Sequence, residues 1–93
     1  MPIFFVKAKG SSFHNNLDKV NEGDELEMQW GTKEFPKGIR LSSNESILGW
    51  IPTRTAEKMF YFKGKGKQYK CFLAKFNMHG GGRVGFNVRV EVK

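Results

Sequence analysis

The sequence predicts a mainly β fold, a β-barrel-like domain of about six antiparallel strands with one short helix between the fourth and fifth strands. Apolar and polar residues alternate with a period of two over most of the chain, which is typical of half-buried strands. Glycine and polar clusters separate these segments at short intervals. The 93 residues fit a single domain spanning 1–93, and the 14% aromatic content supplies apolar surface for a core.

The first half of the chain contains the first four strands. Residues 2–9 alternate and predict the first strand, and the polar stretch 13–23 predicts a loop from which Leu17 and Val20 reach the core. The second strand, 24–30, has two distinct faces, an inner one of Leu26, Met28 and Trp30 and a solvated one of Glu25, Glu27 and Gln29. Residues 39–41 and 47–51 predict two further strands joined by the polar turn 42–46.

The second half predicts the helix and the last two strands. Proline at position 52 suits a helix start, and the stretch 53–60 carries an apolar stripe of Ala56, Met59 and Phe60 that ends before Gly64 and Gly66. Residues 67–78 predict a long strand, with Phe72, Ala74, Phe76 and Met78 on one face and Tyr69, Cys71, Leu73, Lys75 and Asn77 on the other. Three glycines, 80–82, predict a hairpin turn into a last strand at 84–92.

The residues that carry out most enzyme chemistry do not form a recognisable pattern, so we expect no enzyme activity, no metal site and no small-molecule cofactor. The histidines, His14 and His79, lie far apart, and one cysteine offers no zinc-ligand spacing. Cys71 stands between aromatic residues in a strand and is expected to be an inert buried thiol. The glycine-rich segments at 64–67 and 80–82 match no nucleotide-binding loop.

The chain is expected to be cytoplasmic, or nuclear in a eukaryote. A single cysteine excludes an internal disulfide, which favours a reducing compartment. The apolar start of the chain lacks the basic lead and length of a signal peptide, and no apolar run reaches the length of a membrane span.

Positive charge is concentrated in one half of this basic protein. The formal net charge is +7, and the excess lies in residues 50–93, whereas residues 1–49 are nearly balanced. Charge asymmetry of this kind favours a polyanionic partner, nucleic acid above all. The alternative is a basic surface that only keeps the protein soluble.

Eight residues are the candidate nucleic-acid contacts. Lysine and arginine neutralise phosphates, and accessible rings stack on unpaired bases, so a mixture of the two favours single strands. Three further residues are expected to extend the basic surface along the last hairpin, namely His79, Arg83 and Arg89. For Trp50 a core position is equally compatible with the sequence. The predicted phosphate contacts are Arg54, Lys58, Lys63, Lys65, Lys67 and Lys70, and the predicted stacking residues are Trp50 and Tyr69.

The segment Ile47-Leu48-Gly49-Trp50-Ile51-Pro52, with Ala56 and Met59 after it, resembles the "GYIP…A…L" core of the HIRAN domain. Looser echoes cover most of the chain, as expected of a divergent member. They include a "GD.L.L" strand at 23–28, a short strand at 38–41 and a long strand that begins at Tyr69 after a lysine-rich turn.

The resemblance implies a small β-barrel that binds DNA, in studied members the 3′ end of a single strand. By position, Trp50, Thr53 and Arg54 would face the binding groove, and residues 10–12 would line it. The family's "REP.N..D.NAI" segment is replaced by residues 30–39, which lack its Asn and Asp. Lys33 and Lys37 are expected to contact phosphate instead.

Together these observations predict a non-catalytic domain that binds nucleic acid, with single-stranded DNA favoured and single strands preferred to duplex. The alternative is a small protein-binding module, such as a phage-encoded accessory protein or inhibitor, that engages an acidic protein surface.

Overall fold

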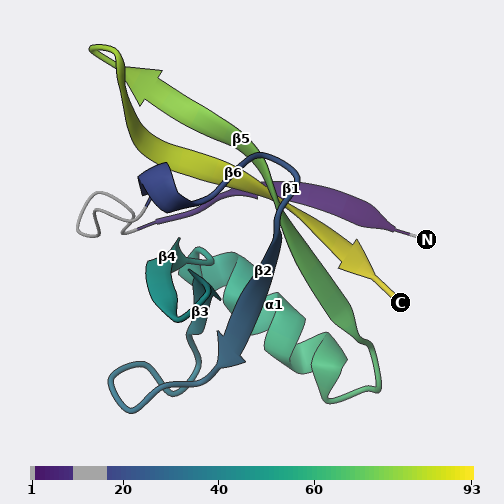
Figure 1. Cartoon of the computed structure of the whole chain (residues 1–93). Helices are drawn as coiled ribbons and strands as arrows, with labels where there is room; N and C mark the ends of the chain where they lie inside the picture. The colour runs from purple at the N-terminus through teal and green to yellow at the C-terminus, as the bar shows by residue number, and fades with distance from the viewer. Residues whose placement is uncertain (1, 10–16) are drawn as a thin grey trace.

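The computed structural model describes residues 2–9 and 17–93, and it confirms the predicted fold class (Figure 1). Six antiparallel strands curl around a common core, and the single α-helix lies between the fourth and fifth strands. A short 3₁₀ helix, η2, stands in the predicted loop, where Leu17 and Val20 are buried as expected. The elements are β1 (Ile3–Lys7), η2 (Leu17–Lys19), β2 (Glu25–Trp30), β3 (Ile39–Ser43), β4 (Ser46–Trp50), α1 (Thr53–Lys63), β5 (Tyr69–His79) and β6 (Gly82–Val92).

The two edges of the sheet meet at one point. The strand order is β1-β6-β5-β2-β3-β4, so β1 and β4 are the edge strands. Beyond the end of β1, Lys9 pairs with Trp50 at the end of β4 through two backbone hydrogen bonds of 2.8 Å. This antiparallel bridge turns a curled sheet into a nearly closed barrel.

Gly49 makes this closure possible because its backbone passes directly beneath the other edge. A Cβ atom at position 49 would lie 2.9 Å from the carbonyl oxygen of Lys9 and 3.4 Å from the ring of Phe86. Contacts that short do not occur between real Cβ atoms and backbone oxygens, so glycine is required here for close approach.

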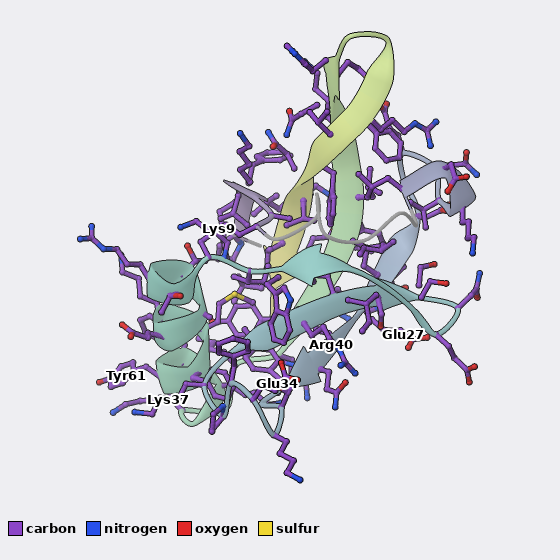
Figure 2. All side chains as sticks on the ribbon, turned by 90° about the vertical axis from the view of Figure 1, so that its left-hand side faces the viewer. Lys9, Glu27, Glu34, Lys37, Arg40 and Tyr61 are labelled. Atoms are coloured by element: carbon purple, nitrogen blue, oxygen red, sulfur yellow. The ribbon has the colours of Figure 1, made fainter. Side chains whose placement is uncertain are left out.

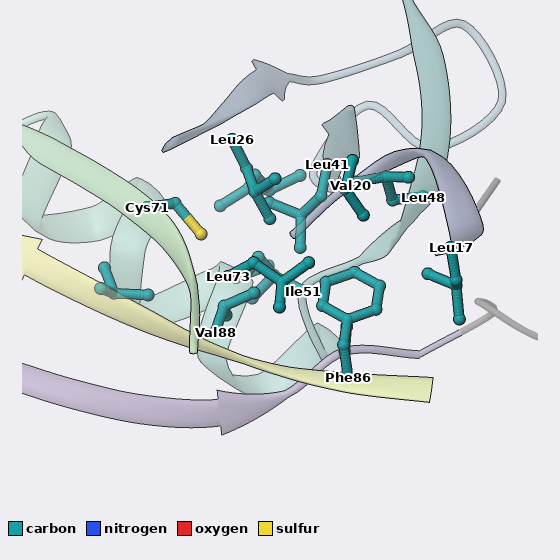
Figure 3. Close-up of a cluster of buried hydrophobic side chains, with 14 of the residues drawn as sticks. Leu17, Val20, Leu26, Leu41, Leu48, Ile51, Cys71, Leu73, Phe86 and Val88 are labelled. Carbon is teal, nitrogen blue, oxygen red and sulfur yellow. The ribbon is translucent and has the colours of Figure 1, made fainter. Parts of the chain in front are cut away.

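The core fills the inside of the barrel (Figure 3). Inward residues of the strands meet there, and α1 adds Ala56 and Met59. The inner face of β2 is confirmed, since Leu26 is buried and Met28 and Trp30 pack against the core. The largest fully buried side chains are Phe86, Ile39, Leu41, Leu48, Met59, Leu73, Val88 and Val90.

The prediction that one face of β5 runs from Phe72 to Met78 is wrong. The pairing of β5 with β6 shifts register between Leu73 and Lys75, as in a β-bulge, so the inward face changes at that point. Before the shift Cys71 and Leu73 are buried, after it Phe76 is buried, and Met78 is exposed. A period-two pattern cannot reveal an extra residue that reverses the phase of the strand.

The helix begins where the sequence predicts and ends three residues later. Pro52 occupies the N-cap position, and the helix continues through Lys63. Gly64 still has helical dihedrals, and the residue with the left-handed conformation that ends the helical path is Gly66, with a φ of 93°. Within the described part of the chain, no helix has the length and apolar character needed to cross a membrane.

Gly49→Ala is expected to lower the free energy of unfolding by about 1–3 kcal/mol, because the added methyl group pushes the Lys9 backbone off Trp50. Equilibrium urea unfolding measures this. Gly82→Ala is the matched control, since a Cβ there would meet its nearest atom, the His79 carbonyl oxygen, at an ordinary 3.8 Å. Equal stability of the two variants would contradict the role of Gly49 in closure.

Candidate nucleic-acid interface

The C-terminal half of α1, the turn 64–68 and the start of β5 form the most basic part of the described structure, which we call the basic end. The turn has a defined backbone: the Lys65 N–H donates to the Phe62 carbonyl at 3.0 Å, and the Lys67 N–H donates to the same carbonyl at 3.1 Å. Gly66 adopts a positive φ of 93°, which glycine tolerates without strain. The turn therefore presents Lys63, Lys65 and Lys67 as exposed side chains on an ordered loop.

Two of these lysines place their ammonium groups over aromatic rings. The Nζ atom of Lys63 lies 4.8 Å from the ring centre of Trp30, and the Nζ atom of Lys65 lies 5.3 Å from that of Tyr61. The Tyr61 side chain is 60% exposed and that of Phe62 is 47% exposed, and their ring centres are 5.2 Å apart. Cation and ring surfaces are thus offered together to an incoming ligand.

Trp30 anchors this arrangement, although the alternating pattern of its strand assigns it only to the core. Its ring packs edge-on against Phe60 at 5.2 Å and lies 5.6 Å from the ring of Tyr69. The ring is half-buried and carries Lys63 on its exposed side. The sequence does hint at this exposure, because Trp30 is the last residue of its strand and the inward face of a strand can reach solvent at its end.

The eight predicted contacts fall into two groups. The basic end contains six of them, namely Lys58, Lys63, Lys65, Lys67, Tyr69 and Lys70, whereas Trp50 and Arg54 lie at the opposite end of α1. An 11-residue helix is about 16 Å long, so most of its length separates Arg54 from Lys63 and the turn, whereas Lys58, one turn after Arg54, lies between the two groups.

Trp50 belongs to a separate hollow below the β2–β3 connection, which we call the Trp50 hollow. The Trp50 ring is half-buried and packs edge-on against the Phe35 ring, with 5.2 Å between the two ring centres. Gly38 approaches the same ring so closely that a Cβ there would lie 3.2 Å from it. The hollow has a volume of about 480 Å³ and is lined by Gln29, Thr32, Lys33, Glu34, Phe35, Arg40, Ile47 and Trp50.

Arg40 is a cation of the Trp50 hollow that the sequence pattern did not single out. It stands between Gln29 on β2 and Trp50 on β4 in the strand register, and its guanidinium donates to the side-chain oxygen of Gln29. Its Nε atom is buried without a hydrogen-bond partner in the described structure. Figure 2 shows Arg40, Glu34 and Lys37 on one side of the molecule. Lys33 lines the hollow, but Lys37 does not.

Lys70 differs from the lysines of the turn because glutamates line the same hollow and stand opposite it in the sheet. A second hollow, of about 530 Å³, is lined by Lys70 and Tyr69 together with Glu25 and Glu27 of β2. Lys70 also stands directly opposite Glu91 in the β5–β6 register. Its charge is therefore partly balanced, which makes it a weaker phosphate contact than the lysines of the turn.

The sequence predicts that the basic surface extends along the last hairpin, but the two arginines there already contact other residues of the fold. The Arg83 guanidinium donates to the carbonyls of Leu17 and Val20 at 2.7 and 3.2 Å and lies 3.9 Å from the Phe76 ring centre. Arg89 forms an ion pair of 3.1 Å with Glu91 and lies over Phe72. His79 is exposed at the tip. Residues 10–12, expected to line a groove, and His14 lie outside the described residues.

Burial raises the pKa of two titratable side chains. Desolvation raises the pKa of the Cys71 thiol to about 12, so the thiol stays protonated and unreactive at neutral pH. Burial also raises the pKa of Tyr69. Across residues 2–9 and 17–93, no group of three or more His, Cys, Asp or Glu side chains is placed to hold a metal ion.

Comparison with known proteins supports the fold. No family model matches the chain, and no curated protein matches its sequence. The crystal structure of the HIRAN domain of human HLTF is similar, with a TM-score of 0.74 and 12% sequence identity over 97% of this chain and 74% of that chain. The resemblance to HIRAN found in the sequence is confirmed as a shared fold.

Cys71 provides a test of the buried thiol. Because the folded pKa is about 12 and the ordinary value is 9.0, the thiol's contribution to stability is complete below pH 9 and is lost as pH rises towards 12. The stability advantage of the wild type over Cys71→Ala should therefore shrink by about 1.4 kcal/mol per pH unit above pH 9. Urea unfolding of both proteins across this range measures it, and a constant difference would contradict the burial.

Proposed function

We propose that this chain binds nucleic acid without catalysis, that single-stranded DNA is its favoured ligand, and that the basic end is the main contact surface. One observation supports the proposal above all: the lysines at 58, 63, 65 and 67 are exposed around two exposed rings, Tyr61 and Phe62. Within the described structure none of these lysines forms an ion pair with a carboxylate.

Exposed lysines without a carboxylate partner suit phosphates. Each lysine that neutralises a phosphate releases condensed counterions, which favours binding and makes it sensitive to salt. Exposed rings add affinity only when bases are unstacked, because a duplex hides the faces of its bases. The mixture of the two therefore favours a single strand over a duplex.

The fold and the Trp50 hollow also support the proposal. This chain shares the fold of a HIRAN domain. The resemblance to that family implies DNA binding. In the hollow, Lys33 and Arg40 place cationic side chains beside the Trp50 ring. The hollow also contains Glu34, and residues 30–39 lack the family's Asn and Asp groups, so the proposal covers phosphate contact there and not recognition of a strand end.

Replacing Lys63 and Lys65 together by Glu is expected to weaken binding of fluorescein-labelled oligo(dT) by about tenfold or more at about 50 mM salt. The slope of log affinity against log salt should fall by about 0.7 for each phosphate that the variant no longer neutralises. Fluorescence anisotropy measures both quantities. The control is Lys19→Glu on η2, which is compared with Lys65→Glu alone because each of these variants reverses a single charge. If it weakens binding as much as a reversal at the turn, net charge and not the basic end determines affinity.

Tyr61→Ala is expected to weaken oligo(dT) binding by about 1–3 kcal/mol because a stacking ring is removed, and to leave duplex binding unchanged. The ring is mainly exposed, so thermal stability should change little. Met78→Ala removes an equally exposed side chain from the far hairpin and serves as the control. An equal decrease in affinity for single-stranded and duplex DNA would argue against stacking.

A further inference from the structure

Along the free edge of β1, every second residue has backbone N–H and C=O groups without a partner. The even-numbered residues of this segment bond to β6: the Ala8 N–H donates to Phe86 at 2.9 Å, and the Pro2 carbonyl accepts from Val92 at 3.0 Å. Antiparallel pairing alternates, so the backbone groups of the odd-numbered residues point outward. Lys9 uses its outward groups to pair with Trp50.

Ile3, Phe5 and Lys7 have no such partner. β1 pairs only with β6 in the described sheet, and β4 reaches it only at Lys9. An edge with unpaired N–H and C=O groups is a template for another strand. These three residues and their neighbours correspond to a segment of about five residues, or about 17 Å.

An apolar groove runs beside this edge, between β1 and α1. Phe4 and Val6 line it from β1, and Val92 lines it from β6. Its volume of about 410 Å³ is in the range of ligand-binding clefts. The remaining lining residues come from α1 and the start of β5, namely Thr55, Lys58, Met59, Phe62, Lys67 and Tyr69.

The positive charge of the groove favours a ligand that carries negative charge. Lys58 and Lys67 are exposed, and no carboxylate is among the lining residues. The opposite face of β1 is apolar, with Phe5 64% exposed and Ile3 52% exposed. A second copy of β1 suits the edge poorly, because residues 2–9 contain Lys7 and Lys9 and no acidic residue.

We infer that β1 accepts an extended acidic peptide from a partner protein as an added strand. Backbone hydrogen bonds to Ile3, Phe5 and Lys7 hold the peptide, and alternate apolar side chains enter the groove or cover Phe5. Flanking carboxylates of the peptide pair with Lys58 and Lys67. This function lies beyond DNA binding, and the two ligands compete because they share these two lysines.

Phe5→Pro tests the added strand. Proline removes the outward N–H of residue 5 and leaves the bonds to β6 intact, as an edge position permits. The probe is the fluorescein-labelled peptide EEVLVLVEE, and the control probe is KKVLVLVKK. Phe5→Pro should weaken binding of the acidic probe by about tenfold, whereas Phe5→Ala, which keeps the N–H, should weaken it less. Oligo(dT) binding should be unchanged by Phe5→Pro, so loss of peptide binding is distinguishable from failure of the DNA proposal.

Two further measurements apply if Phe5→Pro fails to fold. Hydrogen exchange of the Ile3, Phe5 and Lys7 amides in the wild type should slow when the acidic probe binds. Lys58→Glu with Lys67→Glu should weaken that probe by about tenfold, and Lys65→Glu should not. No saturable binding of the acidic probe up to about 1 mM, equal binding of the basic probe, or unchanged exchange at the three amides would overturn the inference.

Discussion

The backbone bridge between Lys9 and Trp50 is the constraint on which the rest of the structure depends. It joins the two edges of the sheet, and Gly49 lets the strands approach closely enough for it to form. Because Trp50 ends β4 at the bridge and Pro52 starts α1, the closure also fixes where the helix leaves the barrel. Trp50 itself lines one hollow, and α1, which starts three residues after Trp50, contributes side chains to the basic end and to the groove beside β1.

The distribution of charge follows from chain order as well as from folding. Lysines 58 to 67 lie on consecutive elements, so the charge asymmetry of the sequence becomes a charge asymmetry of the molecule. The remaining cations are separated by folding. Arg83 and Arg89 are engaged with carbonyls, rings and a carboxylate, and Lys70 faces Glu25, Glu27 and Glu91. The total of 16 lysines and arginines therefore overstates the number of cations that are available to contact a polyanion.

The basic end and the groove beside β1 are adjacent and share Lys58 and Lys67. Under the two proposals above, nucleic acid and an acidic peptide therefore compete for these two lysines. The two surfaces differ in what else they offer. Exposed rings suit bases, whereas unpaired backbone groups suit an extended peptide.

Local patterns in the sequence determined the six strands, the helix after Pro52, the inner face of β2 and the HIRAN-like fold, because each depends on residues close together along the chain. Only the tertiary structure decided the register shift in β5, the unpaired edge of β1, and the pairing of Arg40 and Trp30 with distant residues. Period and propensity assign a residue to a face. Which faces meet, and which cations keep their charge unpaired, depends on strand register and barrel closure, which involve residues far apart in the sequence.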